Sequence, residues 1–188
     1  MQKDKLIIAI TGASGSIYAK QLLLHLQLLP NPPEIVLIFS ENGKKIWDFE
    51  LDSQKLEEKN LKIFLINNFF APVASGSAGY NAMVIVPCSM GTLGRIASGT
   101  SDNLITRAAD VILKEKRKLI LVPRESPYNL IHLRNMETLL LAGADILPAS
   151  PSFYSKPATI EELVNTVTER ILCKLGYCEG TYKWKENV

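Results

Sequence analysis

Three short segments of the sequence carry residues that could bind or transform a ligand. Each follows a run of apolar residues, and together they supply glycines, hydroxyl groups, one arginine and one glutamate. Arg124 is predicted to bind an anion and Glu125 to transfer protons, although a surface ion pair between the two is an alternative. The segments are Gly12-Ala13-Ser14-Gly15, Pro87-Cys88-Ser89-Met90-Gly91-Thr92 and Pro123-Arg124-Glu125-Ser126-Pro127.

The first segment, residues 12–15, is predicted to bind an anion. It lies between an apolar run and a segment of helical spacing from about Ser16 to Leu29, and the start of a helix presents free N–H groups and the positive end of its dipole. The alternative is a tight strand-to-helix turn that requires glycine only for its backbone. A dinucleotide site is disfavoured because the third glycine of that fingerprint is missing and the second apolar run ends in Ser40 rather than an acid. A mononucleotide is therefore favoured.

These segments require a sheet that brings them to one edge. The apolar runs are short and continuous, which is typical of parallel strands covered on both faces. The carboxyl ends of such strands meet at one edge, where α/β sheets bind ligands. We therefore predict an α/β, three-layer, flavodoxin/Rossmann-like fold with a mostly parallel sheet. The runs are Ile7–Ile10, Ile35–Phe39, Met83–Val86, Leu119–Val122 and Ala144–Leu147.

Two further helices and one long loop are predicted. The segment 101–116 has an apolar stripe, and Arg107 and Lys114 project from one face of it about 10 Å apart. A last helix runs over 159–176, with Thr159 and Glu162 forming a capping box. The pattern weakens between Leu51 and Ala82, and its second half is predicted to be a long loop, a feature that in compact domains tends to be functional.

Length and composition favour one domain over residues 1–188, with a core of about 6–176 and a surface tail at 177–188. The chain has 188 residues, of which 47% are apolar, enough for one substantial core. The formal net charge is +2, without the basic stripe of a nucleic-acid binder. The first apolar run is too short for a secretion signal or a membrane span. We expect a cytoplasmic protein with no nucleic-acid or membrane partner.

The cysteines predict neither a disulfide framework nor a metal cluster. There are three of them, Cys88, Cys173 and Cys178, without CxxC spacing and with only two histidines in the chain. Cys88 is more typical of a small buried residue than of a nucleophile.

Five ordered motifs, taken together, resemble the UbiX-type flavin prenyltransferases. The resemblance extends from Leu6 to about Gly176. The motifs are Thr11-Gly12-Ala13-Ser14-Gly15, Pro87-Cys88-Ser89-Met90-Gly91-Thr92-Leu93, Asn103-Leu104-Ile105-Thr106-Arg107-Ala108-Ala109-Asp110-Val111 with Leu113-Lys114-Glu115, Val122-Pro123-Arg124-Glu125-Ser126-Pro127, and Pro151-Ser152-Phe153-Tyr154.

This resemblance implies that reduced FMN is the prenyl acceptor and dimethylallyl monophosphate the donor, with no metal. It further implies a homo-oligomer, typically a dodecamer, whose prenylated FMN serves a UbiD-type decarboxylase, often in ubiquinone biosynthesis. The implied FMN contacts are Gly12, Ala13, Ser14, Ser40, Ser89, Met90, Gly91, Thr92 and Arg124. The implied donor contacts are Tyr154, Arg170, Lys114 and Arg107, with Arg170 acting at or across a subunit boundary.

The implied catalytic residues are Glu50, Glu125, Ser14 and Phe69, with the two glutamates moving protons. Phe69 belongs to Phe69-Phe70-Ala71-Pro72, where the family often carries tryptophan before Ala-Pro. Phenylalanine keeps a weaker aromatic face, which bears on the rate or the preferred donor rather than on the reaction class.

Two alternative functions remain open from the sequence. An FMN-dependent cysteine decarboxylase requires a catalytic histidine and a Pro-x-Met-Asn loop, and neither His25 nor His132 has that context. A non-catalytic FMN carrier needs no second phosphate pocket, so Tyr154, Arg170 and Lys114 distinguish it from the enzyme.

Overall fold

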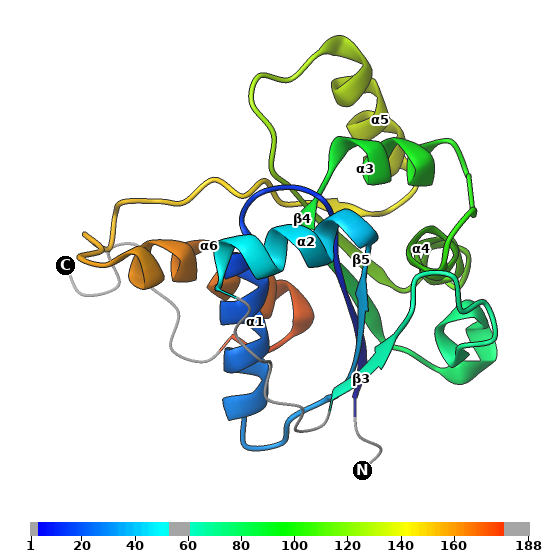
Figure 1. Ribbon diagram of the computed structural model, residues 1–188, viewed down its shortest axis with the longest axis horizontal. Helices are drawn as coiled ribbons and strands as arrows, with labels where there is room; N and C mark the ends of the chain where they lie inside the picture. Colours follow the sequence, from blue (N-terminus) through cyan, green and yellow to red (C-terminus); the bar gives the residue numbers. More distant parts are fainter. Residues whose placement is uncertain (1–3, 53–60, 179–188) are drawn as a thin grey trace.

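Six parallel strands form the centre of the part of the chain that the structure describes. The computed structural model (Figure 1) describes residues 4–52 and 61–178. The strand order β3-β2-β1-β4-β5-β6 is of the Rossmann type, and every neighbouring pair is parallel, which confirms the predicted α/β sheet. The strands are β1 (Lys5–Ile10), β2 (Glu34–Phe39), β3 (Leu61–Phe64), β4 (Ala82–Cys88), β5 (Lys118–Pro123) and β6 (Asp145–Ile146).

Helices cover both faces of this sheet and complete the three layers. α1, α2 and α6 pack on one face, while α3, α4 and α5 pack on the other. The bounds are α1 (Ser16–Leu28), α2 (Glu41–Glu50), α3 (Met90–Ala97), α4 (Leu104–Lys114), α5 (Leu130–Leu141) and α6 (Ile160–Leu175), with 3₁₀ turns η1 (Pro72–Ala74) and η2 (Gly76–Ala78). Among the described residues, no helix combines the length and the apolar character needed to cross a membrane.

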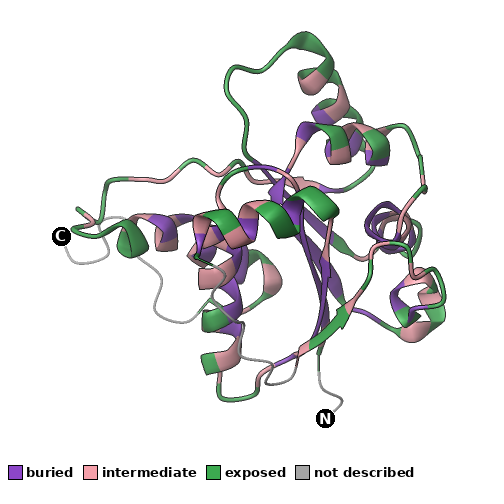
Figure 2. Cartoon of the chain, in the orientation of Figure 1, coloured by how far each residue is buried: buried purple, intermediate pink, exposed green. Residues whose placement is uncertain are grey.

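The continuous apolar runs are explained by the two cores that flank the sheet. In β1, Ile7 and Ala9 face one core while Leu6, Ile8 and Ile10 face the other, because successive side chains of a strand point to opposite faces. Figure 2 shows the resulting band of buried residues along the central strands. An alternating pattern would have left one face in water.

Several elements differ from those predicted. The predicted helix at 101–116 begins at Leu104, because the Asn103 side chain accepts the N–H groups of Ile105 and Thr106. β3 is a short edge strand that was not predicted, because two of its four residues are exposed and Lys62 interrupts its apolar pattern. The predicted ligand loop at 87–92 is divided between the end of β4, the cap residue Ser89 and the first turn of α3. The predicted strand at 144–147 is reduced to the two residues of β6.

The cysteine prediction is partly wrong. Cys173 and Cys178 form a disulfide, with their Cα atoms 4.3 Å apart. Gly176 ends α6 at a φ of 100°, and this reversal returns Cys178 to the last turn of the helix. Cys88 is free and fully buried as predicted, and burial raises the pKa of its thiol to about 12, against a smaller lowering by the backbone N–H of Leu93.

The predicted tail at 177–188 is described only at its first two residues. Tyr177 packs against the core that contains α6, and its hydroxyl donates a hydrogen bond to Asp4 at 2.9 Å. Tyr177 therefore belongs to the packed part of the chain, and the remaining tail prediction lies outside the described residues.

Candidate functional site

The three segments singled out in the sequence meet at one edge of the sheet, here called the carboxyl edge. They follow β1, β4 and β5. The Arg124 Nε group donates to the carbonyl of Ser14 at 3.2 Å, and the Arg124 N–H donates to the carbonyl of Cys88 at 3.4 Å. The edge includes the point between β1 and β4 where the strand order reverses, a common ligand site in α/β sheets. The predicted convergence is confirmed.

Glu50 supplies an anion to the start of α1. Its carboxylate accepts the N–H of Gly15 at 3.0 and 3.1 Å and the N–H of Ser16 at 2.8 Å. Glu50 is the last residue of α2, so the close packing of α2 beside α1 creates this contact. The two N–H groups predicted to meet a ligand anion therefore hold the chain's own carboxylate.

These contacts keep Glu50 ionised. Burial acts to raise its pKa, but hydrogen bonds from the Ser14 side chain and from the backbone of Gly15 and Ser16 outweigh burial and lower the pKa below its ordinary 4.5. A carboxylate bonded to a neighbouring hydroxyl can accept a proton at neutral pH. Glu50 and Ser14 thus lie together at the carboxyl edge, joined by a hydrogen bond to the ionised carboxylate.

Two other helices begin at the carboxyl edge with serine caps. The Ser40 hydroxyl accepts the N–H of Gly43 at 2.9 Å, and the Ser89 hydroxyl accepts the N–H of Thr92 at 3.3 Å. Gly43 is required because a Cβ there would lie 2.3 Å from the carbonyl oxygen of Ile10. The starts of α2 and α3 are therefore held close to the end of β1, and helix starts of this kind bind anions.

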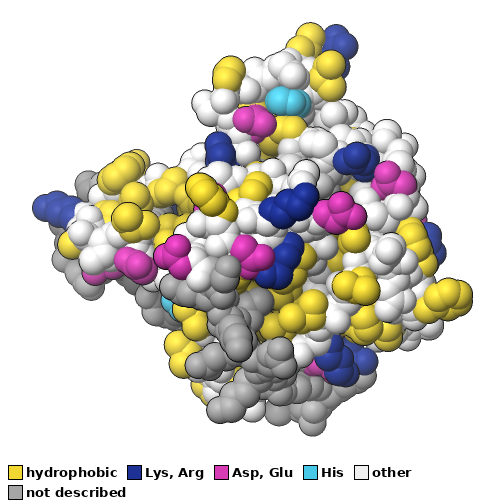
Figure 3. Space-filling model, in the orientation of Figure 1, with side chains coloured by type: hydrophobic (Ala, Val, Ile, Leu, Met, Phe, Trp, Pro, Cys, Tyr) yellow, Lys and Arg dark blue, Asp and Glu magenta, His cyan; other side chains and the backbone are white. Residues whose placement is uncertain are grey.

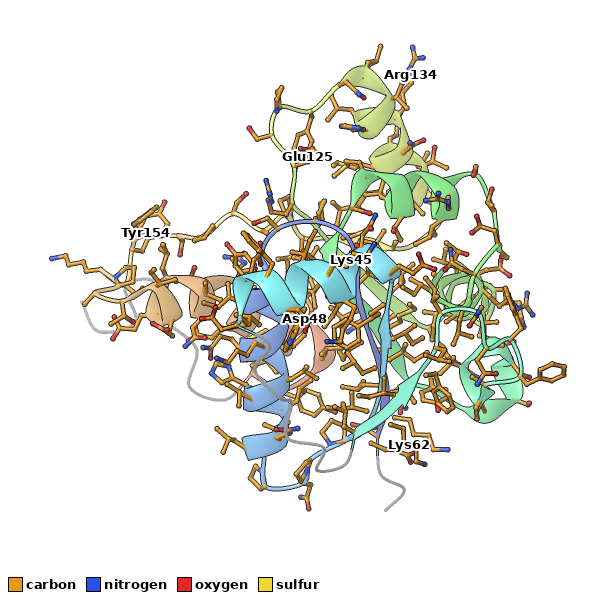
Figure 4. All side chains as sticks on the ribbon, in the orientation of Figure 1. Lys45, Asp48, Lys62, Glu125, Arg134 and Tyr154 are labelled. Carbon is orange, nitrogen blue, oxygen red and sulfur yellow. A yellow bond between two sulfur atoms is a disulfide. The ribbon has the colours of Figure 1, made fainter. Side chains whose placement is uncertain are left out.

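Tyr154 and Arg170 line a separate pocket of about 1020 Å³. Figure 1 shows the segment before α6 extending away from the sheet, and Figure 4 shows Tyr154 on it. The N–H of Ser152 donates to the Thr166 hydroxyl at 3.0 Å, which ties this segment to α6. The structure therefore brings these two predicted donor residues together.

Arg107 and Lys114 lie elsewhere in the protomer. They belong to α4, which packs on the face of the sheet opposite to α6. Arg107 donates to the carbonyl of Ala74 at 3.2 Å and to Asp110 at 3.0 Å, while Lys114 pairs with Glu115. The structure does not bring these two cations to Tyr154 and Arg170 within one chain.

Glu125 and Phe69 are exposed. Figure 4 shows Glu125 on the segment between β5 and α5, and its carboxylate accepts the N–H of Ser126 at 3.0 Å. Phe69 lies between β3 and η1 and is 44% exposed. Neither side chain is buried against the Glu50 and Ser14 pair. Among the described residues, no group of three or more His, Cys, Asp or Glu side chains could hold a metal.

Comparison with known proteins identifies the family. The flavoprotein family profile matches residues 1–172. The chain is 48% identical over 181 residues to the flavin prenyltransferase UbiX of Methanocaldococcus jannaschii, covering 95% of this chain and 97% of the relative. It is 42% identical over 189 residues to UbiX of Pseudomonas aeruginosa, covering 92% and 90%. The chain belongs to the UbiX-type flavin prenyltransferases.

Solved UbiX-type structures have the same fold. AnUbiX (PadA1), in complex with FMN and dimethylallyl pyrophosphate, superposes with a TM-score of 0.87 at 36% identity, covering 98% of this chain and all of that one. A dodecameric FMN-dependent UbiX-like decarboxylase from Escherichia coli O157:H7 gives 0.87 at 37% identity, covering 96% and 99%. The peptidyl-cysteine decarboxylase EpiD, at 20% identity and a TM-score of 0.57, shares the fold alone. The resemblance predicted from the sequence motifs is confirmed.

The donor groups at the carboxyl edge suit the FMN of a UbiX-type protein. The starts of α2 and α3, the hydroxyls of Ser40, Ser89 and Thr92, and the Arg124 guanidinium are the groups that bind phosphate monoesters in proteins. Glu50 already occupies the start of α1. The phosphate of FMN therefore fits best at α2 and α3.

Sequence reasoning missed one residue at this edge, Thr11. Its hydroxyl is buried between the segments after β1 and β4. In the sequence, Thr11 stands as the first residue of the first motif, directly after an apolar run, and this position does not reveal a partner 76 residues away.

Proposed function

We propose that this protein is a flavin prenyltransferase that joins the dimethylallyl group of dimethylallyl monophosphate to N5 and C6 of reduced FMN without a metal. The observation that carries the proposal, within a UbiX-type chain, is the second pocket with Tyr154 and Arg170. A protein that only carries FMN needs one phosphate site. A tyrosine hydroxyl and a guanidinium suit the phosphate of a second substrate.

FMN is held by the residues of the carboxyl edge, through backbone N–H groups and hydroxyls. Reduced FMN supplies a nucleophilic nitrogen for the allylic carbon. The proposed contacts are Gly12, Ala13, Ser14, Ser40, Ser89, Met90, Gly91, Thr92 and Arg124.

Arg170 and Tyr154 bind the donor phosphate and stabilise the charge that develops on it as the C1–O bond breaks. Arg107 and Lys114 add positive charge to this pocket from a neighbouring subunit, since they lie on the opposite face of their own sheet. The Phe69 ring faces the allyl group, and its π face stabilises developing positive charge by about 0.5–1 kcal/mol.

Glu50, with Ser14, accepts a proton from the flavin as the bond to C6 forms. Glu125 moves a proton on the side of the prenyl donor. The position of Glu50 supports its role as the base, because its carboxylate lies at the carboxyl edge against Gly15 and Ser16 and is ionised at neutral pH. The product, prenylated FMN, is then consumed by a UbiD-type decarboxylase in the cytoplasm.

Mass spectrometry of the flavin tests this proposal. Purified protein is incubated anaerobically with reduced FMN and dimethylallyl monophosphate, in parallel with the pyrophosphate that AnUbiX was crystallised with, each with and without EDTA. We expect a flavin heavier by one prenyl unit with the monophosphate, unaffected by EDTA. Recovery of unmodified FMN from folded protein with both donors contradicts the proposal and favours the carrier.

The cysteine decarboxylase alternative has no support in the geometry. His132 caps α5, where its Nδ1 accepts the N–H of Asn129 at 3.4 Å. His25 lies on α1 in its last turn, at the end of the helix away from the carboxyl edge. His25 is therefore remote from the flavin edge, and His132 takes part in the cap of α5.

We propose that the copies of a homo-oligomer, a dodecamer as in the E. coli relative, pack through α5. This helix exposes several large apolar side chains in one protomer, and an exposed apolar patch of this kind marks a protein contact. Figure 3 shows hydrophobic side chains at its tip. Its exposed apolar residues are Leu130, Ile131, Leu133, Leu140 and Leu141.

Leu141→Glu is therefore expected to yield a smaller species than the wild type in light scattering, because the new charge is buried at the contact. Leu141 is 84% exposed in the protomer, so the substitution leaves the fold of one chain intact. Lys45→Glu on the exposed part of α2 is the control and should keep the wild-type mass. An unchanged mass for Leu141→Glu places the contacts elsewhere.

A further inference from the structure

Thr11 joins the two segments that meet at the switch point of the sheet. Its side chain is 1% exposed. The hydroxyl donates to the carbonyl of Pro87 at 2.8 Å and accepts the N–H of Ser89 at 2.8 Å. One hydroxyl thus uses both its donor and its acceptor capacity across the gap between β1 and β4.

The residues on either side of Thr11 belong to the proposed FMN site. Gly12 begins the turn after β1, and Ser89 is the cap of α3. The Ser89 hydroxyl contacts Thr92 through its N–H at 3.3 Å and through its hydroxyl at 3.1 Å. A continuous set of hydrogen bonds therefore runs from the end of β1 through Thr11 to the first turn of α3.

We propose that Thr11 is a positioning residue for the flavin site, and that it fixes the start of α3 relative to the glycine turn. The proposal rests on the proposed binding of FMN at this edge. Thr11 is too deeply buried to reach a ligand itself, so it acts through Ser89 and Thr92.

Valine is the sharpest replacement because it keeps the shape of threonine and removes the hydroxyl. The Pro87 carbonyl still accepts the Thr11 backbone N–H at 3.3 Å, but the Ser89 N–H loses its partner. A partly buried N–H without a partner is unfavourable, so Ser89 and the start of α3 are expected to shift to find one. Serine at position 11 keeps the hydroxyl and should keep the geometry.

The test compares FMN affinity, measured by quenching of flavin fluorescence, for the wild type, Thr11→Val, Thr11→Ser and Thr168→Val. We expect Thr11→Val to raise the Kd for FMN about tenfold and Thr11→Ser to stay within about threefold of the wild type. Thr168 is a matched control because it is fully buried and its hydroxyl bonds only within α6, to Asn165. Thr168→Val should lower the melting temperature but not the FMN affinity.

The outcomes separate this proposal from the proposed function. Wild-type protein that does not bind FMN overturns the function. Wild-type protein that binds FMN, together with Thr11→Val of equal affinity, overturns the role of Thr11 alone, as does a Thr11→Ser variant as weak as Thr11→Val.

Hydrogen exchange in the wild type keeps the test valid if Thr11→Val does not fold. In the FMN-free protein, the Ser89 amide should be protected by its bond to Thr11 and should exchange as slowly as the amides of β4. Exchange of the Ser89 amide as fast as that of an exposed loop amide shows that the bond is not held, and overturns the proposal.

Discussion

Replacing Arg170 by alanine is expected to lower turnover of the prenyl donor at least about 100-fold while FMN binds with wild-type affinity. The guanidinium is proposed to stabilise the phosphate as it leaves, and removing one such donor commonly slows a reaction by two to three orders of magnitude. FMN binding should not change, because Arg124 and the starts of α2 and α3 hold the flavin at the carboxyl edge. Single-turnover formation of prenylated flavin and a separate FMN titration measure the two effects.

Lys174→Ala is the matched control for this variant. Lys174 lines the same pocket, but its ammonium group pairs with Asp145 at 2.8 Å. Lys174 is not one of the proposed donor contacts, so the variant should retain activity within about threefold. Equal losses for both variants would mean that the total charge of the pocket matters rather than Arg170. A loss of FMN affinity in Arg170→Ala would mean that the two phosphates are assigned the wrong way round.

Mixed oligomers test whether the donor pocket is shared between subunits. Arg170→Ala and Lys114→Ala protomers are each expected to be inactive alone, since each lacks one of the cations proposed for the donor. If α4 of one copy meets α6 of another, some pockets in a mixture receive both wild-type residues. Mixing after dissociation should then restore part of the activity, whereas a pocket built within one chain would stay inactive in every mixture.

The elements that could be predicted from the sequence are those whose structure is determined by the local pattern of apolar residues. β1, β2, β4 and β5 have continuous apolar runs because both of their faces are buried, which is typical of a parallel sheet whose connecting helices cover both faces. β3 could not be found in this way, because its edge position leaves Lys62 in water. α5 lacks a single apolar stripe, since Met136 and Leu139 are buried while Leu130 and Leu141, on another side of the helix, are exposed in the protomer.

The position of the candidate site at the carboxyl edge could be predicted from the sequence, but the contacts between its residues could not. Glycine, serine and threonine residues that directly follow apolar runs predict where the carboxyl edge lies, and this prediction does not depend on how the helices pack. The pairing of Glu50 with Gly15 spans 35 residues and depends on how α2 lies beside α1, which no local pattern encodes. The Cys173 and Cys178 bond likewise depends on the reversal at Gly176.

Glu50→Gln is expected to lower the rate of prenylated flavin formation about 100-fold, the usual scale for the loss of a general base. Glutamine keeps an oxygen that accepts the N–H groups of Gly15 and Ser16, so FMN should still bind. What it cannot do is take up a proton. Asp48→Asn is the control, because it removes a carboxylate from the same helix that pairs only with Lys44 at the surface. A Glu50→Gln variant with wild-type rate would assign proton transfer to another group.

The same variant should change how the stability of the protein depends on pH. Hydrogen bonds in the folded state outweigh burial and lower the pKa of Glu50 below its ordinary 4.5, so its charge stabilises the fold above that value. This contribution, about 1 kcal/mol for a partly exposed carboxylate at a helix start, is lost as the pH falls through the lowered folded-state pKa. Urea unfolding should therefore show Glu50→Gln less stable than the wild type at pH 7, with the difference closing toward pH 3. If the two proteins differ in free energy of unfolding by the same amount at every pH, the shape of the side chain destabilises the variant, rather than the loss of the Glu50 charge at the start of α1.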